Sequence, residues 1–300
     1  MLGKVISIRG KFIHVHVDGQ VEICTIKNCL RREKSDQKGT LTIGDSVEIN
    51  ENSQIVTIYE RKTILQRTDP LNARKRQVLG ANIDQVYITF ATKSPDINIP
   101  MLDRYIMAAQ KGNLTPIIII NKIDLVNSNQ EIDDLVKIYT NIGIKIIPVS
   151  TQTKQGIEEV KNSLCGYTSM LSGPSGTGKS SLINLITGSS LEVGAISERI
   201  QKGRHTTTFS SLIAIDNETF IIDTPGIASF SVFDLTLIDI AEYFSDLCEP
   251  LGSCKFRTCT HTHEPFCSAK QALMQNLISP IRFSSHQVII DSVLNKESIY

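Results

Sequence analysis

Short runs of alternating apolar and polar residues fill the chain from residue 1 to residue 66. They read KVISIRG, FIHVHVDG, QVEICTI, DSVEINE and QIVTIYE, and Gly, Asn and Asp separate them. A period of two predicts strands with one buried face, and several short strands of this kind predict a small antiparallel barrel. Residues 67–82, RTDPLNARKRQVLGAN, are basic and rich in turn formers, so we predict a connector there.

The pattern changes at residue 83. Apolar strand-like runs such as IDQVYITFA, TPIIIINKID and IKIIPVS now alternate with amphipathic helical stretches such as MLDRYIMAAQKGN. This alternation predicts a mostly parallel sheet covered by helices on both faces, and we place this α/β domain at 83–232. FSSLIAID and ETFIIDTPG add two strands joined by a turn.

Residues 233–300 lack that alternation. They contain a Cys/His cluster and helical runs, SAKQALMQNLI and SSHQVIIDSVL, which predict a small helical domain. Three domains suit a chain of 300 residues, because single cores of about 100–200 residues are usual.

Charge and hydropathy narrow the classes of partner. The net charge is +0, with 31 basic and 31 acidic residues, so bulk electrostatics gives no argument for nucleic-acid binding. Residues 1–76 carry 14 Lys and Arg against 9 Asp and Glu, a local excess of 14 − 9 = +5. The longest aliphatic run, PIIIINKIDL, is too short for a bilayer, and no signal-like segment follows Met1. We therefore expect a soluble, cytoplasmic protein without a membrane partner.

Residues 173–180, GPSGTGKS, fit the phosphate-loop pattern G-x-x-x-x-G-K-[ST] between a predicted strand and a predicted helix. Its backbone N–H groups would cradle phosphates, Lys179 would reach the β and γ phosphates, and Ser180 would bind Mg²⁺. The alternative is a glycine-rich turn with a chance lysine. The predicted contacts are Gly173, Pro174, Ser175, Gly176, Thr177, Gly178, Lys179, Ser180 and Ser181.

The stretch NKID at 121–124 predicts recognition of guanine. Asp124 would accept from two N–H groups of the guanine edge that adenine does not present, and an unpaired acceptor there costs about 1–3 kcal/mol. Asn121 would support the loop, the stem of Lys122 would lie over the ring, and Ile123 completes the motif. In VSTQTKQGI, Ser150 and Thr151 are candidates for further contacts to the base. A loop at a helix start is the alternative for so short a match.

Two further segments carry candidate hydrolytic chemistry. Asp223 and Gly226 belong to DTPG, where the carboxylate would hold the Mg²⁺ shell and the amide would sense the γ-phosphate. The residue after this glycine is Ile227, so a water-orienting glutamine is missing. In KGRHTTTF, Thr207 would complete Mg²⁺ coordination and His205 would orient the attacking water. A solvent-exposed or packing histidine is the alternative for His205.

Seven cysteines occur in the chain, and four lie between residues 248 and 267. Cys254, Cys259, His261 and Cys267 have the donor types and short spacings of a closed tetrahedral zinc site, which would be structural. Free loop cysteines are the alternative. Cys248 and His263 are spare donors, so the fourth ligand stays open.

With the base motif, phosphate loop, the threonines of KGRHTTTF, DTPG and the Cys₃His cluster in this order, the chain resembles the circularly permuted GTPases that depend on the small ribosomal subunit, the RsgA (YjeQ) family. The resemblance implies an OB-type barrel, a permuted GTPase domain and a zinc-binding tail. It implies a GTPase of late small-subunit maturation that is stimulated by the subunit and uses GTP/GDP, Mg²⁺ and Zn²⁺. It also implies contact with 16S rRNA, and placement on one subunit favours a monomer.

Two other function classes remain open. One is an RNA-binding scaffold whose guanine nucleotide is never turned over, and the other is an ATP-using phosphotransferase. The reversed order of the base motif and the phosphate loop does not argue against a GTPase. A parallel sheet packs in the same way whatever the order of its connections, provided that the original termini lie close together.

Overall fold

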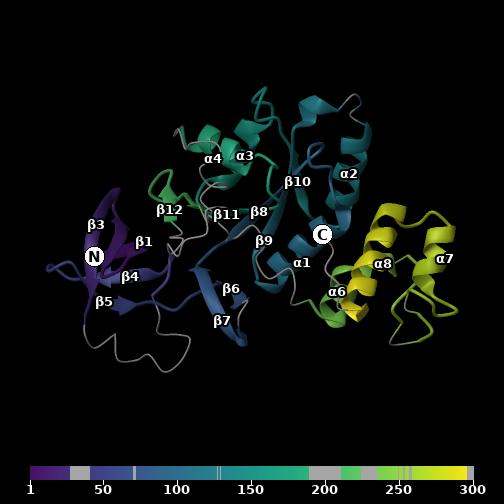
Figure 1. The fold of residues 1–300 in the computed structure, drawn as a ribbon, viewed down its shortest axis with the longest axis horizontal. Helices are drawn as coiled ribbons and strands as arrows, with labels where there is room; N and C mark the ends of the chain where they lie inside the picture. The colour runs from purple at the N-terminus through teal and green to yellow at the C-terminus, as the bar shows by residue number, and fades with distance from the viewer. Residues whose placement is uncertain are drawn as a thin grey trace.

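The alternating runs at the start of the chain form a closed five-stranded barrel in the computed structural model of the protein (Figure 1). The strands are β1 (Leu2–Arg9), β2 (Phe12–Val17), β3 (Gln20–Ile26), β4 (Ser46–Ile49) and β5 (Gln54–Ile58). Four of the pairings are antiparallel, whereas β3 and β5 pair in parallel. The prediction of an antiparallel barrel was wrong at this seam, because β1 pairs with β4 and leaves β5 to close the barrel against β3.

The structure describes residues 1–27, 41–69, 72–126, 128, 130–188, 211–223, 235–248, 250–252, 254–256 and 259–295. None of the helices in these ranges combines the length and the apolar character that crossing a bilayer requires.

An antiparallel ribbon occupies the segment that the sequence predicts as a connector. It consists of β6 (Ile64–Asp69) and β7 (Asn72–Ala81). The ribbon ends against the barrel, where Ala81 N donates to Ile43 O at 2.8 Å and Asn82 Nδ2 donates to Gly44 O at 2.9 Å. The basic residues Arg67, Arg74, Lys75 and Arg76 thus belong to paired strands, while the domain boundaries stay a prediction.

The central sheet has the strand order β10-β9-β8-β11-β13-β12. Its strands are β8 (Gln85–Ala91), β9 (Thr115–Asn121), β10 (Lys145–Pro148), β11 (Thr168–Ser172), β12 (Ser211–Ala214) and β13 (Phe220–Asp223). All neighbours are parallel except β12 and β13. The predicted mostly parallel sheet is confirmed. Its continuous apolar runs, such as the fully buried β8, reflect burial on both faces.

Helices cover both faces of this sheet (Figure 1). The apolar sides of α1 (Ile99–Lys111) and α2 (Gln130–Asn141) pack on one face, and those of α3 (Ile157–Leu164) and α4 (Lys179–Thr187) pack on the other. Asn98 starts α1, because its side chain accepts a hydrogen bond from Met101 N at 3.0 Å.

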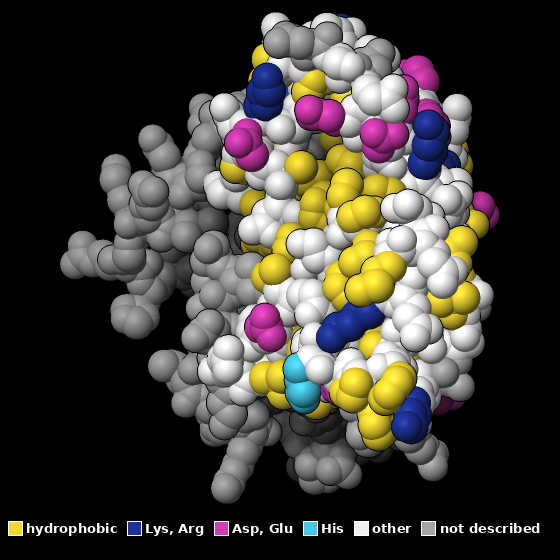
Figure 2. All heavy atoms as spheres, turned by 90° about the vertical axis from the view of Figure 1, so that its right-hand side faces the viewer, with side chains coloured by type: hydrophobic (Ala, Val, Ile, Leu, Met, Phe, Trp, Pro, Cys, Tyr) yellow, Lys and Arg dark blue, Asp and Glu magenta, His cyan; other side chains and the backbone are white. Residues whose placement is uncertain are grey.

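The C-terminal module contains α6 (Leu237–Tyr243), the 3-10 helix η2 (Ser245–Leu247), α7 (Ser268–Met274) and α8 (Pro280–Asn295). The sequence predicts α7 and α8 but misses α6, which Thr236 and Asp239 start with a reciprocal capping box. Apolar side chains gather over the outer face of this module (Figure 2). The large exposed ones on α7 and α8 are Met274, Ile281, Val288 and Leu294.

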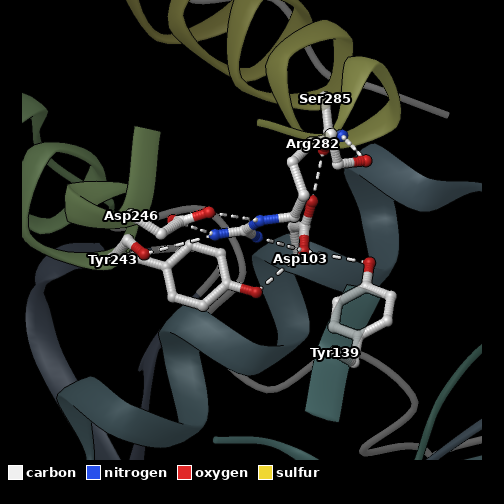
Figure 3. A network of polar contacts seen from close by, with 7 residues as sticks. Asp103, Tyr139, Tyr243, Asp246, Arg282 and Ser285 are labelled. Carbon is white, nitrogen blue, oxygen red and sulfur yellow. Dashed lines mark hydrogen bonds and ion pairs between the residues drawn. The ribbon is translucent and has the colours of Figure 1, made fainter. Parts of the chain in front are cut away.

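A buried polar network joins the C-terminal module to the sheet domain (Figure 3). Asp103 of α1 and Arg282 of α8 form an ion pair at 3.1 Å, with side chains 0% and 1% exposed. Asp103 also accepts hydrogen bonds from Tyr139 of α2, Tyr243 of α6 and Ser285 of α8. The carboxylate therefore has four donors from three helices besides its own, which is how a charge tolerates burial.

Candidate functional site

The predicted motifs meet at the carboxyl ends of the central strands, although they are far apart in the chain. Asn121 is the last residue of β9, the phosphate loop leaves β11, and Asp223 is the last residue of β13. These strands are parallel, so their carboxyl ends lie at the same end of the sheet, which is where open α/β sheets bind ligands. The order of motifs along the chain does not affect this meeting, because strand position depends on pairing.

Two glycines give the phosphate loop its shape. Gly173 has a φ of +132°, and a Cβ there would lie 2.2 Å from Thr89 O in β8. Gly178, the residue before α4, has a φ of +92°, and a Cβ there would lie 2.2 Å from Asn121 Nδ2. Both positions combine a left-handed backbone with a contact that excludes any side chain. The loop thus presents backbone N–H groups at the N-terminus of α4, as phosphate binding requires.

Lys179 is folded back over this loop. Its Nζ donates to Gly173 O at 2.8 Å and to Pro174 O at 2.6 Å. Burial lowers the pKa of Lys179 to about 8, because desolvation disfavours the charged amine. An ammonium held by two loop carbonyls lies where the loop would surround a phosphate, and an incoming anion would restore the pKa of Lys179.

Asn121 connects the base motif to the phosphate loop. Its Nδ2 donates to Thr177 O at 2.9 Å, and its Oδ1 accepts from Lys122 N at 2.8 Å and from Thr151 N at 3.1 Å. The side chain is fully buried. One amide therefore fixes the relative positions of three loops, those that carry NKID, GPSGTGKS and the Ser150–Thr151 pair.

Asp124 lies on the exposed 3-10 helix η1 (Ile123–Leu125). Its Oδ1 accepts from the buried Ser150 hydroxyl at 2.5 Å, and Ser150 Oγ also accepts from Thr153 N at 3.0 Å. Ile123 N donates to Val149 O at 3.3 Å. The carboxylate is thus oriented from the loop after β10 on a residue that is itself exposed, an arrangement suited to reading a base edge.

The remaining predicted nucleotide and Mg²⁺ residues divide into two groups. Ser180 and Ser181 form the first turn of α4, while Ser175 and Gly176 are exposed at the loop tip. His205, Thr207 and Gly226 lie outside the described residues.

The Cys/His cluster converges on one point. Cys254, Cys259, His261 and Cys267 place their ligand atoms within 4.8 Å of one another. His261 Nδ1 lies 3.5, 3.6 and 3.3 Å from Sγ of Cys254, Cys259 and Cys267, and Cys254 Sγ lies 3.9 Å from Cys267 Sγ. Bonds of about 2.3 Å to sulfur and about 2.0–2.1 Å to nitrogen give tetrahedral edges of about 3.5–3.8 Å. The four donors therefore fit a zinc ion closely.

The two spare donors have other roles in the described structure. Cys248 Sγ lies 3.4 Å from Nε2 of His261, the ring nitrogen on the side away from the cluster. It is therefore placed to orient the imidazole, as outer partners of metal-bound histidines do. His263 is exposed and contacts the Thr262 hydroxyl at 2.9 Å. This geometry therefore favours His261, rather than Cys248 or His263, as the fourth ligand.

One neighbouring segment was not predicted from the sequence. The loop after β8 lies against the base motif, where Thr92 N donates to Asn121 O at 3.0 Å. It has no recognisable motif, and its place after a central strand of the sheet was the only available signal.

Comparison with known proteins identifies the family. A model of the RsgA GTPase family matches residues 58–233. A Bacteroides thetaiotaomicron protein named small ribosomal subunit biogenesis GTPase RsgA 2 is 34% identical over 294 residues, covering 95% of both chains. The chain belongs to the RsgA GTPase family. An RsgA of Phocaeicola vulgatus with the same biogenesis name is 35% identical over 294 residues, again covering 95% of both chains.

Solved structures of related proteins agree with this assignment. YjeQ from Thermotoga maritima is 27% identical, covers 98% of each chain and has a TM-score of 0.77. YloQ, described as a circularly permuted GTPase, is 26% identical with a TM-score of 0.74, and the match covers 100% of this chain and 96% of that one. The predicted resemblance and the predicted fold class are confirmed. The protein is accordingly a GTP hydrolase, an activity that implies GTP, GDP and Mg²⁺ as ligands.

Proposed function

We propose that the protein is a GTPase of small ribosomal subunit biogenesis, which hydrolyses GTP to GDP and phosphate with turnover stimulated by the subunit. The names of full-length relatives support this function, and the match to an RsgA GTPase model supports the activity. The observation that carries the proposal is the Asn121 amide, which holds a guanine-reading loop and a phosphate loop in one frame.

We assign the following roles at this site. Asp124, steered by Ser150, reads the guanine edge, and the stem of Lys122 lies over the ring. The backbone N–H groups of residues 173–181, except Pro174, which has none, hold the α and β phosphates, and Lys179 neutralises charge on the β and γ phosphates. Ser180 and Thr207 would hold Mg²⁺, which would supply positive charge to neutralise the phosphate oxygens. The role of His205 in orienting water stays a prediction.

We assign a structural zinc ion to the C-terminal module. Three cysteine sulfurs and one imidazole nitrogen fill a tetrahedron and leave no position for substrate, and these residues pack against the core formed by α6, α7 and α8. The ion would supply part of the folding energy of a module with a small core.

We further propose that the protein contacts 16S rRNA, acts as a monomer and works in the cytoplasm. The local charge excess of +5 over residues 1–76 supports RNA contact through the barrel and the ribbon, because it offers partners for phosphates (14 − 9 = +5).

Phosphate release from GTP, measured with and without purified small subunits, tests the function. We expect slow release from the protein alone and clear stimulation by small subunits but not by large subunits, which serve as the matched control. Binding of GTP without release under both conditions would favour the scaffold alternative. Release from ATP equal to that from GTP would favour the phosphotransferase.

A further inference from the structure

We infer that Thr92 is a positioning residue of the nucleotide site, whose hydroxyl holds Lys122 in the backbone conformation that guanine recognition needs. The inference rests on the proposed guanine site and adds a residue outside its sequence motifs. Thr92 Oγ1 donates to Lys122 O at 2.7 Å, across 30 residues of chain and between the ends of neighbouring strands β8 and β9.

Lys122 needs such support because its backbone is left-handed, with φ at 63° and ψ at 35°. Residues other than Gly, Asn and Asp seldom adopt this region, because the Cβ of an L-residue approaches the following carbonyl. Here the conformation directs the chain from β9 into η1, the short helix that carries Asp124. If the backbone of Lys122 left this left-handed conformation, the Asp124 carboxylate that reads the base would therefore change its orientation.

The loop after β8 also holds the other end of Lys122. Lys122 Nζ donates to the carbonyl oxygens of Lys93 and Ser94, so its stem is stretched along the loop. The same loop borders the phosphate loop, because a Cβ on Gly176 would lie 3.5 Å from Cδ of Pro95. The segment 92–95 thus forms a third wall of the site, beside NKID and GPSGTGKS.

Of the two hydrogen bonds described for Thr92, only the one donated by its hydroxyl depends on the identity of the side chain. The hydrogen bond from Thr92 N to Asn121 O is available to any residue except proline, whereas the bond to Lys122 O requires a short side chain with a donor, and the hydroxyl of serine or threonine is the strong one. Valine has nearly the shape of threonine without the donor, so Thr92→Val removes this one contact. Thr92→Ser keeps the donor and loses a methyl group.

The test compares the affinities of the full-length variants for GDP and for inosine diphosphate, which lacks the exocyclic amine that Asp124 recognises. We expect Thr92→Val to weaken GDP binding by about three- to tenfold, as for one lost hydrogen bond, and inosine diphosphate binding by less. The ratio of GDP affinity to inosine diphosphate affinity should therefore be smaller in Thr92→Val than in wild type. In steady-state hydrolysis, KM for GTP should rise while kcat changes little, and Thr92→Ser should restore the wild-type preference.

The control is Thr57→Val, which removes a threonine hydroxyl bonded to Glu48 at 3.0 Å in the barrel. It should leave both affinities unchanged. An unchanged ratio of GDP affinity to inosine diphosphate affinity in Thr92→Val would overturn the inference, whether both affinities stay the same or both fall by the same factor. Should Thr92→Val fold poorly by circular dichroism, Thr92→Cys, with its weaker donor, is measured instead by the same criteria. Absence of GDP binding by wild type would instead overturn the proposed site.

Discussion

The buried ion pair between Asp103 and Arg282 allows the sharpest prediction about stability. Arg282 is enclosed: Nη2 donates to Asp246 Oδ1 at 2.7 Å, and the guanidinium carbon lies 4.6 Å and 4.3 Å from the ring centroids of Tyr243 and Phe244. Arg282→Met keeps most of the apolar stem but leaves the Asp103 carboxylate buried without its cation. Removing one partner of a buried pair costs about 3–5 kcal/mol, and this network offers three hydroxyl donors that offset a part of that loss.

Urea unfolding followed by circular dichroism measures this cost, since the chain has no tryptophan to report by fluorescence. We expect Arg282→Met to lower the free energy of unfolding by about 3 kcal/mol. Lys161→Met is the matched control, because it breaks a surface pair with Glu158 whose distance, 2.8 Å, is no longer than the 3.1 Å of the buried pair, and it should cost less than about 1 kcal/mol. The double variant Asp103→Leu with Arg282→Met should cost less than the sum of its single variants. Equal losses for Arg282→Met and Lys161→Met would refute the reasoning.

Three further predictions concern the nucleotide site and the metal. Gly178→Ala should abolish GDP binding in a titration calorimeter while the circular dichroism spectrum is kept, because its Cβ would lie 2.2 Å from Asn121 Nδ2; unchanged affinity would contradict the loop geometry. Since burial lowers the pKa of Lys179 to about 8, GDP affinity should be constant from about pH 6.5 to 7.5 and fall above about pH 8, where binding must first return a proton to the amine; a flat profile to pH 9 would count against this. Cys259→Ser should lose the zinc measured by mass spectrometry and lower the melting temperature, whereas the exposed Cys165→Ser should do neither. Full retention of zinc in Cys259→Ser would contradict the assignment of Cys259 as a ligand.

The sequence predicts those parts of the structure that depend on local pattern. Strand and helix periods place the barrel, the central sheet and helices α1–α4, because burial of one face imposes a period on the chain. Short spacing also suffices for the metal cluster, since its four donors lie within fourteen residues and can close on one point.

The sequence does not predict contacts between distant positions. Asp103 and Arg282 are 179 residues apart, and each occurs on a helix face where a solvated charge would be the ordinary interpretation. Thr92 follows a buried strand without a motif, and its role depends on a carbonyl 30 residues away. The parallel closure of the barrel between β3 and β5 likewise depends on which strand β1 takes as a partner.

Nucleotide preference of Asp124→Asn tests most directly whether NKID and the phosphate loop form one guanine site. Asparagine presents a donor where aspartate presents an acceptor, so it should repel the exocyclic amine of guanine and donate a hydrogen bond to the carbonyl oxygen that xanthine has in its place. We predict that Asp124→Asn loses GDP affinity and gains affinity for xanthosine diphosphate, with the fold unchanged by circular dichroism. GDP affinity equal to that of wild type would contradict a site in which this carboxylate reads the base.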